Sequence, residues 1–106
     1  MKQSPTALSL GHLRKTCDAV QVVEKWNPHA RIRQDLFGFI DIIAIRDQET
    51  IAVQSTSWTN VSSRVSKIAE SPLVGFVRQA GWQIIVHGWR KNAKTGRYEM
   101  KELDIS

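Results

Sequence analysis

Phe39-Ile40-Asp41-Ile42-Ile43-Ala44-Ile45 is the stretch that decides the fold. It is too continuously apolar for a strand with one face exposed to solvent, so it predicts a central strand buried on both faces. Asp47-Gln48-Glu49 then offers a turn, and residues 50–56 return as the second strand of a hairpin. The hairpin predicts a fold of the α/β class with a sheet at its centre.

The segments before this hairpin add a helix and a strand. Residues 5–18 predict a helix, because Ser4-Pro5-Thr6 supplies an N-cap and a proline for the first turn, and apolar residues follow at helical spacing. Residues 20–26 are rich in β-branched and aromatic side chains and predict a strand, which Asn27-Pro28 ends.

The segments after the hairpin complete the architecture. Helical spacing begins at residue 60 and is broken by Ser71-Pro72, and a shorter helical stretch at 73–80 ends at Gly81. Residues 82–89 predict a fourth strand, and residues 97–105 a closing strand. The expected order is α-β-β-β-α-β, with a crossover helix, a mixed sheet and a short C-terminal β extension.

Length and composition predict one domain over residues 1–106, with a core at about residues 6–90 and a β tail at 91–106. No apolar stretch approaches the roughly 20 residues of a membrane span, and the N-terminus has no apolar signal-peptide core. A cytoplasmic location without a membrane partner is therefore expected. The single cysteine, Cys17, cannot form an internal disulfide and is expected to be a small core residue.

The positive charge is unevenly distributed. The formal net charge is +5, and between residues 54 and 98 the only acid is Glu70. The basic residues of that segment are Arg64, Lys67, Arg78, Arg90, Lys91, Lys94 and Arg97. This asymmetry favours nucleic acid as a partner.

Asp41 is the sharpest local feature, because an ionised carboxylate in an apolar strand is costly unless a cation or hydrogen-bond donors compensate it. If the strand ran straight through Gly38, alternation would place Asp35 on the same side as Asp41. A bulge at Gly38 would break that alignment. The alternative is a structural Asp41, bonded to the backbone or to an arginine such as Arg33.

Gln54 and Thr56, on the adjoining strand, offer neutral oxygen ligands for a hard cation such as Mg²⁺. Asp41 with Gln54 could hold one metal ion, and Asp35 could add a carboxylate. The alternative is that Gln54 and Thr56 are ordinary solvent-facing strand residues.

The segments Asp35-Leu-Phe-Gly-Phe-Ile-Asp41-Ile-Ile-Ala and Val53-Gln54-Ser-Thr56-Ser57 resemble the PD-(D/E)XK nuclease superfamily. The resemblance is to its small Holliday-junction-resolvase-like and phage-type replication-repair members, which commonly show Gly-x-x-Asp-Ile-Ile-Ala and then Glu-x-Lys. It covers most of residues 6–90. It implies a restriction-endonuclease-like core and a Mg²⁺- or Mn²⁺-dependent endonuclease that hydrolyses phosphodiester bonds, including those of branched or structured DNA.

Carried over by position, the resemblance makes Asp41 the principal metal ligand, Gln54 the counterpart of the second acid and Thr56 the occupant of the lysine position. Threonine removes the cation that would stabilise charge on the phosphate. Lys67, in the crossover helix, could supply that charge from another backbone position, with Arg64 one helical turn earlier. The alternative for Arg64 and Lys67 is a solvated helix face.

The resemblance also calls for an acid in the first helix, where the sequence offers only His12 and Asp18. This gap and Thr56 support a different class of function, a catalytically inactive DNA-binding or partner-docking module. A homodimer would enlarge the DNA footprint of so small a domain, but no residue identifies an interface.

Five residues are candidates for contact with nucleic acid: Arg64, Lys67, Trp89, Arg90 and Lys91. Trp89-Arg90-Lys91 interleaves an aromatic ring with cations, which suits a DNA backbone or a splayed base. Its alternative is a strand-end aromatic residue covering the core. Trp26 and Trp82 are expected to pack in the core or at a sheet edge.

Overall fold

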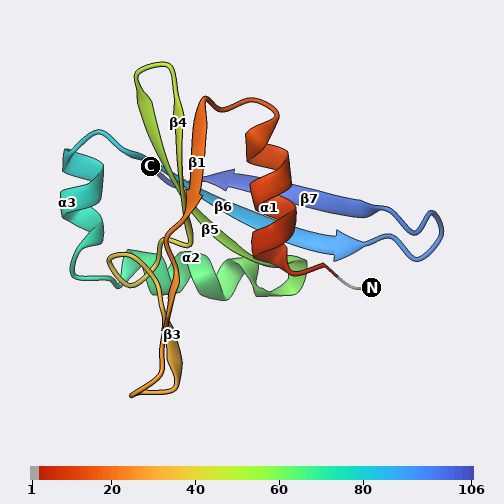
Figure 1. Cartoon of the computed structure of the whole chain (residues 1–106), viewed down its shortest axis with the longest axis horizontal. Coiled ribbons are helices and arrows are strands. Elements are labelled where there is room, and N and C mark those ends of the chain that lie inside the picture. Colours follow the sequence, from red (N-terminus) through yellow and green to blue (C-terminus); the bar gives the residue numbers. More distant parts are fainter. Residues whose placement is uncertain (1–2) are drawn as a thin grey trace.

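The computed structural model describes residues 3–106, which fold around a five-stranded mixed sheet (Figure 1). The helices are α1 (Pro5–Arg14), α2 (Val61–Ala69) and α3 (Val74–Gln79), and a 3₁₀ turn covers Trp58–Asn60. The strands are β1 (Ala19–Val22), β2 (Lys25–Asn27), β3 (Ile32–Gln34), β4 (Ile42–Arg46), β5 (Glu49–Ser57), β6 (Gln83–Lys91) and β7 (Tyr98–Asp104). No helix within the described range is long and apolar enough to cross a membrane.

The predicted hairpin and crossover are confirmed. β4 pairs antiparallel with β5 through a turn at Asp47-Gln48, and β5 pairs parallel with β6 after the chain passes through α2 and α3. β1 and β7 close the two edges in antiparallel pairing, which gives the strand order β1-β4-β5-β6-β7. The mixed α/β sheet expected from the sequence is therefore present.

Helices cover both faces of the sheet. α1 packs on one face, where Leu13 meets Ile42 and Val53, and Cys17 is partly buried against this cluster. α2 and α3 pack on the other face, where Ile68 and Val77 join the second cluster. This cluster also contains Phe39, Ile40, Ala52, Val61, Val74, Ile84 and Val86. Burial on both sides explains the apolar runs at residues 42–44 of β4 and 51–53 of β5. Ile45, near the end of β4, is 43% exposed, so the predicted burial on both faces does not extend to it.

The predicted boundaries before the hairpin were wrong. α1 ends at Arg14, because the amides of Thr16 and Cys17 bond back to Leu13 and the chain then turns toward β4. The single strand predicted over residues 20–26 is broken in two. The amides of Val23 and Glu24 both donate to the carbonyl of Asp41, at 2.8 and 3.3 Å, a bulge-like arrangement at the point where the chain leaves the sheet.

The chain does not run straight from Asp35 to Asp41, so of the two possibilities left open by the sequence the break at Gly38 is the one present. Phe37 and Gly38 have φ values of 55° and 85°, and the amide of Leu36 donates to the carbonyl of Ile40 at 2.9 Å. The chain therefore makes a tight turn at residues 36–40, and β4 begins only after Asp41. The turn, and not strand alternation, sets the relative position of Asp35 and Asp41.

Between these two irregular segments, β2 and β3 form a separate two-stranded ribbon, here called the β2–β3 arm (residues 25–34). Figure 1 shows the arm projecting away from the five-stranded sheet. Asn27 shapes its tip, since Oδ1 accepts from the amides of His29 and Ala30. Trp26 is 55% exposed on this arm, so it does not pack in the core; it lies on an edge strand, because β2 pairs only with β3. Trp82 does pack against the core.

Gly88 of β6 lies directly beneath the start of α2. A Cβ atom at this position would overlap Cγ2 of Val61 and would lie 3.3 Å from Cα of Trp58. Because Val61 is buried and the second neighbour is backbone, we expect Gly88→Ala to lower the free energy of unfolding by about 1–3 kcal/mol. Gly11→Ala, at a helical position with no neighbour within 4 Å, is the matched control and should not destabilise the protein. Denaturant unfolding of both variants checks this; an unchanged midpoint for Gly88→Ala would contradict it.

Candidate metal centre

Three carboxylates meet where the β2–β3 arm joins the sheet. Glu24, Asp35 and Asp41 each place an oxygen within 4.8 Å of the others. Glu24 directly precedes the arm, Asp35 directly follows it, and Asp41 stands immediately before β4. The bulge at residues 23–24 and the turn at 36–40 thus bring together acids that are up to 17 positions apart (41 − 24).

Asp41 is the buried member of this carboxylate cluster, with 3% of its surface exposed. Its Oδ2 accepts two hydrogen bonds of 2.8 Å, one from the backbone N–H of Ser55 and one from Nε2 of Gln54. The predicted bond to backbone is therefore present. The predicted alternative partner Arg33 is bonded to Glu24 instead, at 3.1 Å between Nη1 and Oε1.

The electrostatics of the cluster favour binding of a cation. Burial raises the pKa of Asp41 from its ordinary value of 3.8 to about 8, opposed by the hydrogen bond from the Ser55 amide and reinforced by Asp35 and Glu24. In the absence of a cation, a proton on Asp41 offsets the repulsion between these acids. A divalent cation would displace that proton and compensate all three carboxylates.

Gln54 and Thr56 are buried, with 3% and 5% of their surfaces exposed, so their interpretation as solvent-facing strand residues was wrong. Nε2 of Gln54 donates to Asp41, whereas its Oε1 is buried and has no hydrogen-bond partner. A buried acceptor without a donor, on a side chain bonded to Asp41, is of the oxygen ligand type that Mg²⁺ and Mn²⁺ prefer. Glu24, Asp35 and Asp41 could therefore hold a hard divalent cation.

A cleft of about 460 Å³ opens beside Asp35. It is lined by Arg33 and Gln34 of the arm, by Asp35 and Gly38, and by the exposed Lys67 of α2. Lys67 thus shares a cavity with one of the candidate metal ligands, although it is 32 positions from Asp35 in the sequence (67 − 35). Arg64 is partly buried one helical turn earlier, and Thr56 lies near the end of β5.

The sequence did not identify Glu24. The predicted strand over residues 20–26 made it an ordinary strand residue, and only the broken pairing at residues 23–24 turns it toward the cluster. The two acid-position candidates in or near α1 lie elsewhere. Asp18 accepts from the amide of Asp47 at the opposite end of the β1–β4 pair, and the ring of His12 lies 5.6 Å from that of His87.

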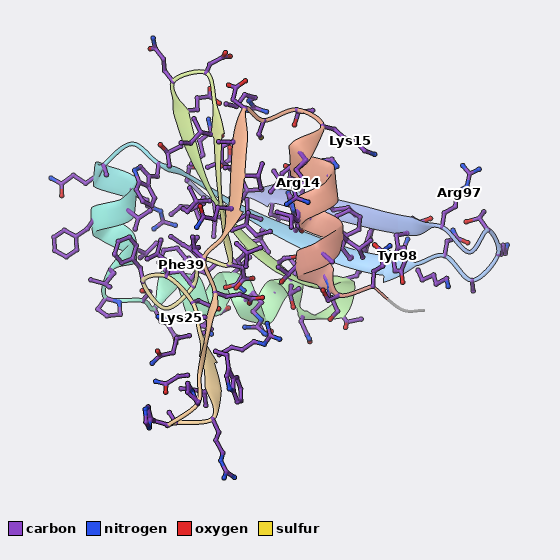
Figure 2. The ribbon with its side chains drawn as sticks, viewed as in Figure 1. Arg14, Lys15, Lys25, Phe39, Arg97 and Tyr98 are labelled. Carbon is purple, nitrogen blue, oxygen red and sulfur yellow. The ribbon has the colours of Figure 1, made fainter. Side chains whose placement is uncertain are left out.

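The predicted nucleic-acid contacts at the end of β6 have partners within the protein. Trp89 is partly buried and its Nε1 donates to Oγ of Ser9 at 2.8 Å, which agrees with a strand-end aromatic residue covering the core. Arg90 donates to Glu99 at 2.8 Å and lies 3.8 Å over the ring of Trp58. Lys91 lies over the ring of Tyr98, in the hairpin whose far end carries Arg97 (Figure 2).

A second polar cluster lies on the α1 face of the sheet and shares Ser55 with the carboxylate site, since the Ser55 amide holds Asp41. Oγ of Ser9 lies 2.7 Å from Oγ of Ser55 and 2.9 Å from Nδ1 of His87. His87 is fully buried, and Oε1 of Glu102 lies 3.4 Å from its Nε2. The buried Ser9, Ser55 and His87 join α1 to β5 and β6, and the half-exposed Glu102 adds a contact from β7. We assign them a structural role because Ser9 is buried with its oxygen shared among three partners.

The stability of this cluster is expected to depend on pH. Burial lowers the pKa of His87 below its ordinary value of 6.5; Glu102 opposes this and His12 adds to it. The unfolded chain therefore binds more protons than the folded protein once the pH falls below about 6.5, and stability is lost in that range. In the wild type, the free energy of unfolding should fall as the pH falls below about 6.5, and His87 can contribute at most about 1.4 kcal/mol per pH unit to this slope. We expect the slope to be smaller in His87→Asn.

His29→Asn, in the exposed tip of the β2–β3 arm, is the matched control and should keep the wild-type slope. Urea unfolding at several pH values measures both. Equal slopes for wild type and His87→Asn would contradict the assignment.

Comparison with protein families, with curated proteins and with solved structures finds no match for this chain. The arrangement of the described residues is therefore what supports a function.

Proposed function

We propose that the protein is a Mg²⁺- or Mn²⁺-dependent nuclease with a restriction-endonuclease-like core. The observation that carries this is the cluster of Glu24, Asp35 and Asp41 beside the unpartnered Oε1 of Gln54. The mixed sheet and the helical crossover to β6 support the proposal, in which the β2–β3 arm and α3 would be additions to that core. The segments that resemble PD-(D/E)XK nucleases contain Asp35, Asp41 and Gln54.

The proposed chemistry divides among the chain's own groups. A bound divalent cation would act as a Lewis acid and would lower the pKa of a bound water molecule, so that hydroxide is accessible near neutral pH. Asp41 is fixed by the Ser55 amide and by Gln54, so it presents one oriented carboxylate to the cation. Asp35 and Glu24 add charge from the two connections between the arm and the sheet, and Lys67 faces the same cleft as Asp35. A phosphodiester in that cleft would meet a cation on one side and an ammonium group on the other.

The test is a cleavage assay on plasmid, linear duplex, single-stranded, flap and four-way-junction DNA, with Mg²⁺, Mn²⁺ or EDTA. We expect cutting that needs the metal, and the panel ranks the substrates. Asp18→Asn is the matched control, since it alters an exposed acid at the far end of β1 and should cut normally. No cutting of any substrate by wild-type protein with bound Mn²⁺ would overturn the proposal.

A catalytically inactive DNA-binding module is the second candidate, and Thr56 favours it. The resemblance places a lysine at that position, whereas Thr56 is a buried neutral residue. Salt-sensitive DNA binding without cleavage, in protein that still binds Mn²⁺, is the result expected for such a module.

A further inference from the structure

The β2–β3 arm has the character of a surface that binds a partner. Its two strands pair only with each other, and both faces of the ribbon are largely open to solvent. Trp26 is 55% exposed and Ile32 is 50% exposed. A two-stranded ribbon is marginally stable in water without other contacts, and exposed large apolar side chains on it add no core packing. Their exposure is explained if a partner covers them.

The charge of the arm specifies a polyanion. Residues 25–34 include Lys25, Arg31 and Arg33 and contain no acid. Arg33 reaches back to Glu24 at the base, with 70% of its side chain exposed, while Lys25 and Arg31 are exposed on the arm itself. Figure 2 shows Lys25 near the base of the arm, well separated from Arg97 at the end of the β6–β7 hairpin.

The shape of the arm fits a duplex groove. The major groove of B-form DNA admits a two-stranded β-ribbon. The pairing of Trp26 with Arg33 and of Asn27 with Ile32 sets the exposed Trp26 and Ile32 on opposite faces of the ribbon. One ribbon can therefore present cations to the phosphates and an apolar side chain to each wall of a groove.

We propose that the β2–β3 arm binds the groove of double-helical DNA and positions the duplex for the carboxylate cluster. This rests on the proposed function and adds the substrate class and the element that holds it. Glu24 directly precedes the arm in the sequence and Asp35 directly follows it, so both lie at its base. Arg33 and Gln34 line the cleft that Lys67 also lines. A duplex held by the arm thus has a phosphate strand within the same cavity as a candidate metal ligand.

The experiment measures binding of a fluorescent linear duplex by anisotropy at several salt concentrations, with Ca²⁺ in place of Mg²⁺. We expect Lys25→Gln/Arg31→Gln to weaken binding about tenfold and to reduce the slope of log K against log salt by about 2. Trp26→Ala should weaken binding with the wild-type slope, because it removes no charge. Lys94→Gln/Arg97→Gln, at the end of the other hairpin, is the matched control with the same charge change.

Wild-type duplex binding by Lys25→Gln/Arg31→Gln would overturn the proposal, as would losses equal to those of the control pair. A loss confined to a single-stranded probe would overturn the choice of duplex. Failure of the nuclease proposal can be distinguished from failure of the arm proposal, because Mn²⁺ binding and cleavage are measured separately. Duplex binding through the arm without cleavage would contradict the nuclease activity and leave the role of the arm intact. Normal cleavage by Lys25→Gln/Arg31→Gln would contradict the role of the arm in DNA binding and leave the nuclease activity intact.

Discussion

Asp41→Asn is expected to lower metal-dependent DNA cleavage by about 10³-fold or more. The variant keeps the size of the side chain and an oxygen that can accept from the Ser55 amide, so the fold is expected to persist. It removes the negative charge at the buried centre of the cluster, and the neutral amide is a weaker ligand for a hard cation. Initial rates on the best substrate of the panel, with circular dichroism to verify the fold, measure the effect.

The direction of the stability change separates the role of Asp41 in function from a role in the fold. Because the pKa of Asp41 is raised from 3.8 to about 8, the unfolded chain releases this proton at a lower pH than the folded protein does. The metal-free protein is therefore destabilised progressively between these two pH values and fully at about pH 8, a cost that Asn does not carry. Asp41→Asn should therefore be at least as stable as wild type at pH 8 without metal. Full cleavage activity in the variant would exclude Asp41 as a metal ligand.

Lys67→Met is expected to lower the cleavage rate by about 10²-fold while leaving Mn²⁺ affinity unchanged. Methionine retains much of the apolar stem and a good helix propensity but removes the ammonium group. Because Lys67 faces the cleft with Asp35 and is exposed, its charge can act on the phosphate without holding the metal. The measurement is kcat under saturating metal, with a parallel titration of Mn²⁺.

Lys94→Met, in the loop of the β6–β7 hairpin, is the control for the loss of one positive charge. It should lower kcat little and affect mainly DNA affinity. Equal kcat values for Lys67→Met and wild type would show that the cation missing at Thr56 is not replaced from α2.

The regular part of the fold could be predicted from residues close together in sequence. The apolar run at residues 39–45, the turn at Asp47-Gln48 and the returning strand need only local pattern, and β4 and β5 follow it closely. The helix after Asn60 and its end before Pro72 likewise depend on spacing and on proline. Topology then follows, because a crossover helix leads to a parallel strand.

The candidate site could be predicted only in part, because irregular backbone builds it. Asp41 and Gln54 stood out as polar residues in apolar strands, and the structure joins them by a 2.8 Å hydrogen bond. Glu24 did not stand out in the sequence. It joins the cluster because the amides of Val23 and Glu24 both donate to the carbonyl of Asp41, an irregular pairing that local pattern does not predict. The sequence left open whether the chain runs straight through Gly38, and the positive φ of Phe37, which is unusual for a non-glycine residue, could not be predicted from local pattern.

The most direct test of the metal centre is a calorimetric titration with Mn²⁺ at pH 8.5, above the pKa of Asp41 of about 8. We predict one saturable site in the wild type, a weaker site in Glu24→Gln, no site in Asp41→Asn and unchanged binding in Asp18→Asn. Glu24→Gln is the sharpest of these, because only the three-dimensional arrangement assigns Glu24 to the cluster. No saturable binding by the wild type, or equal binding by Asp41→Asn, would contradict a metal centre at these carboxylates.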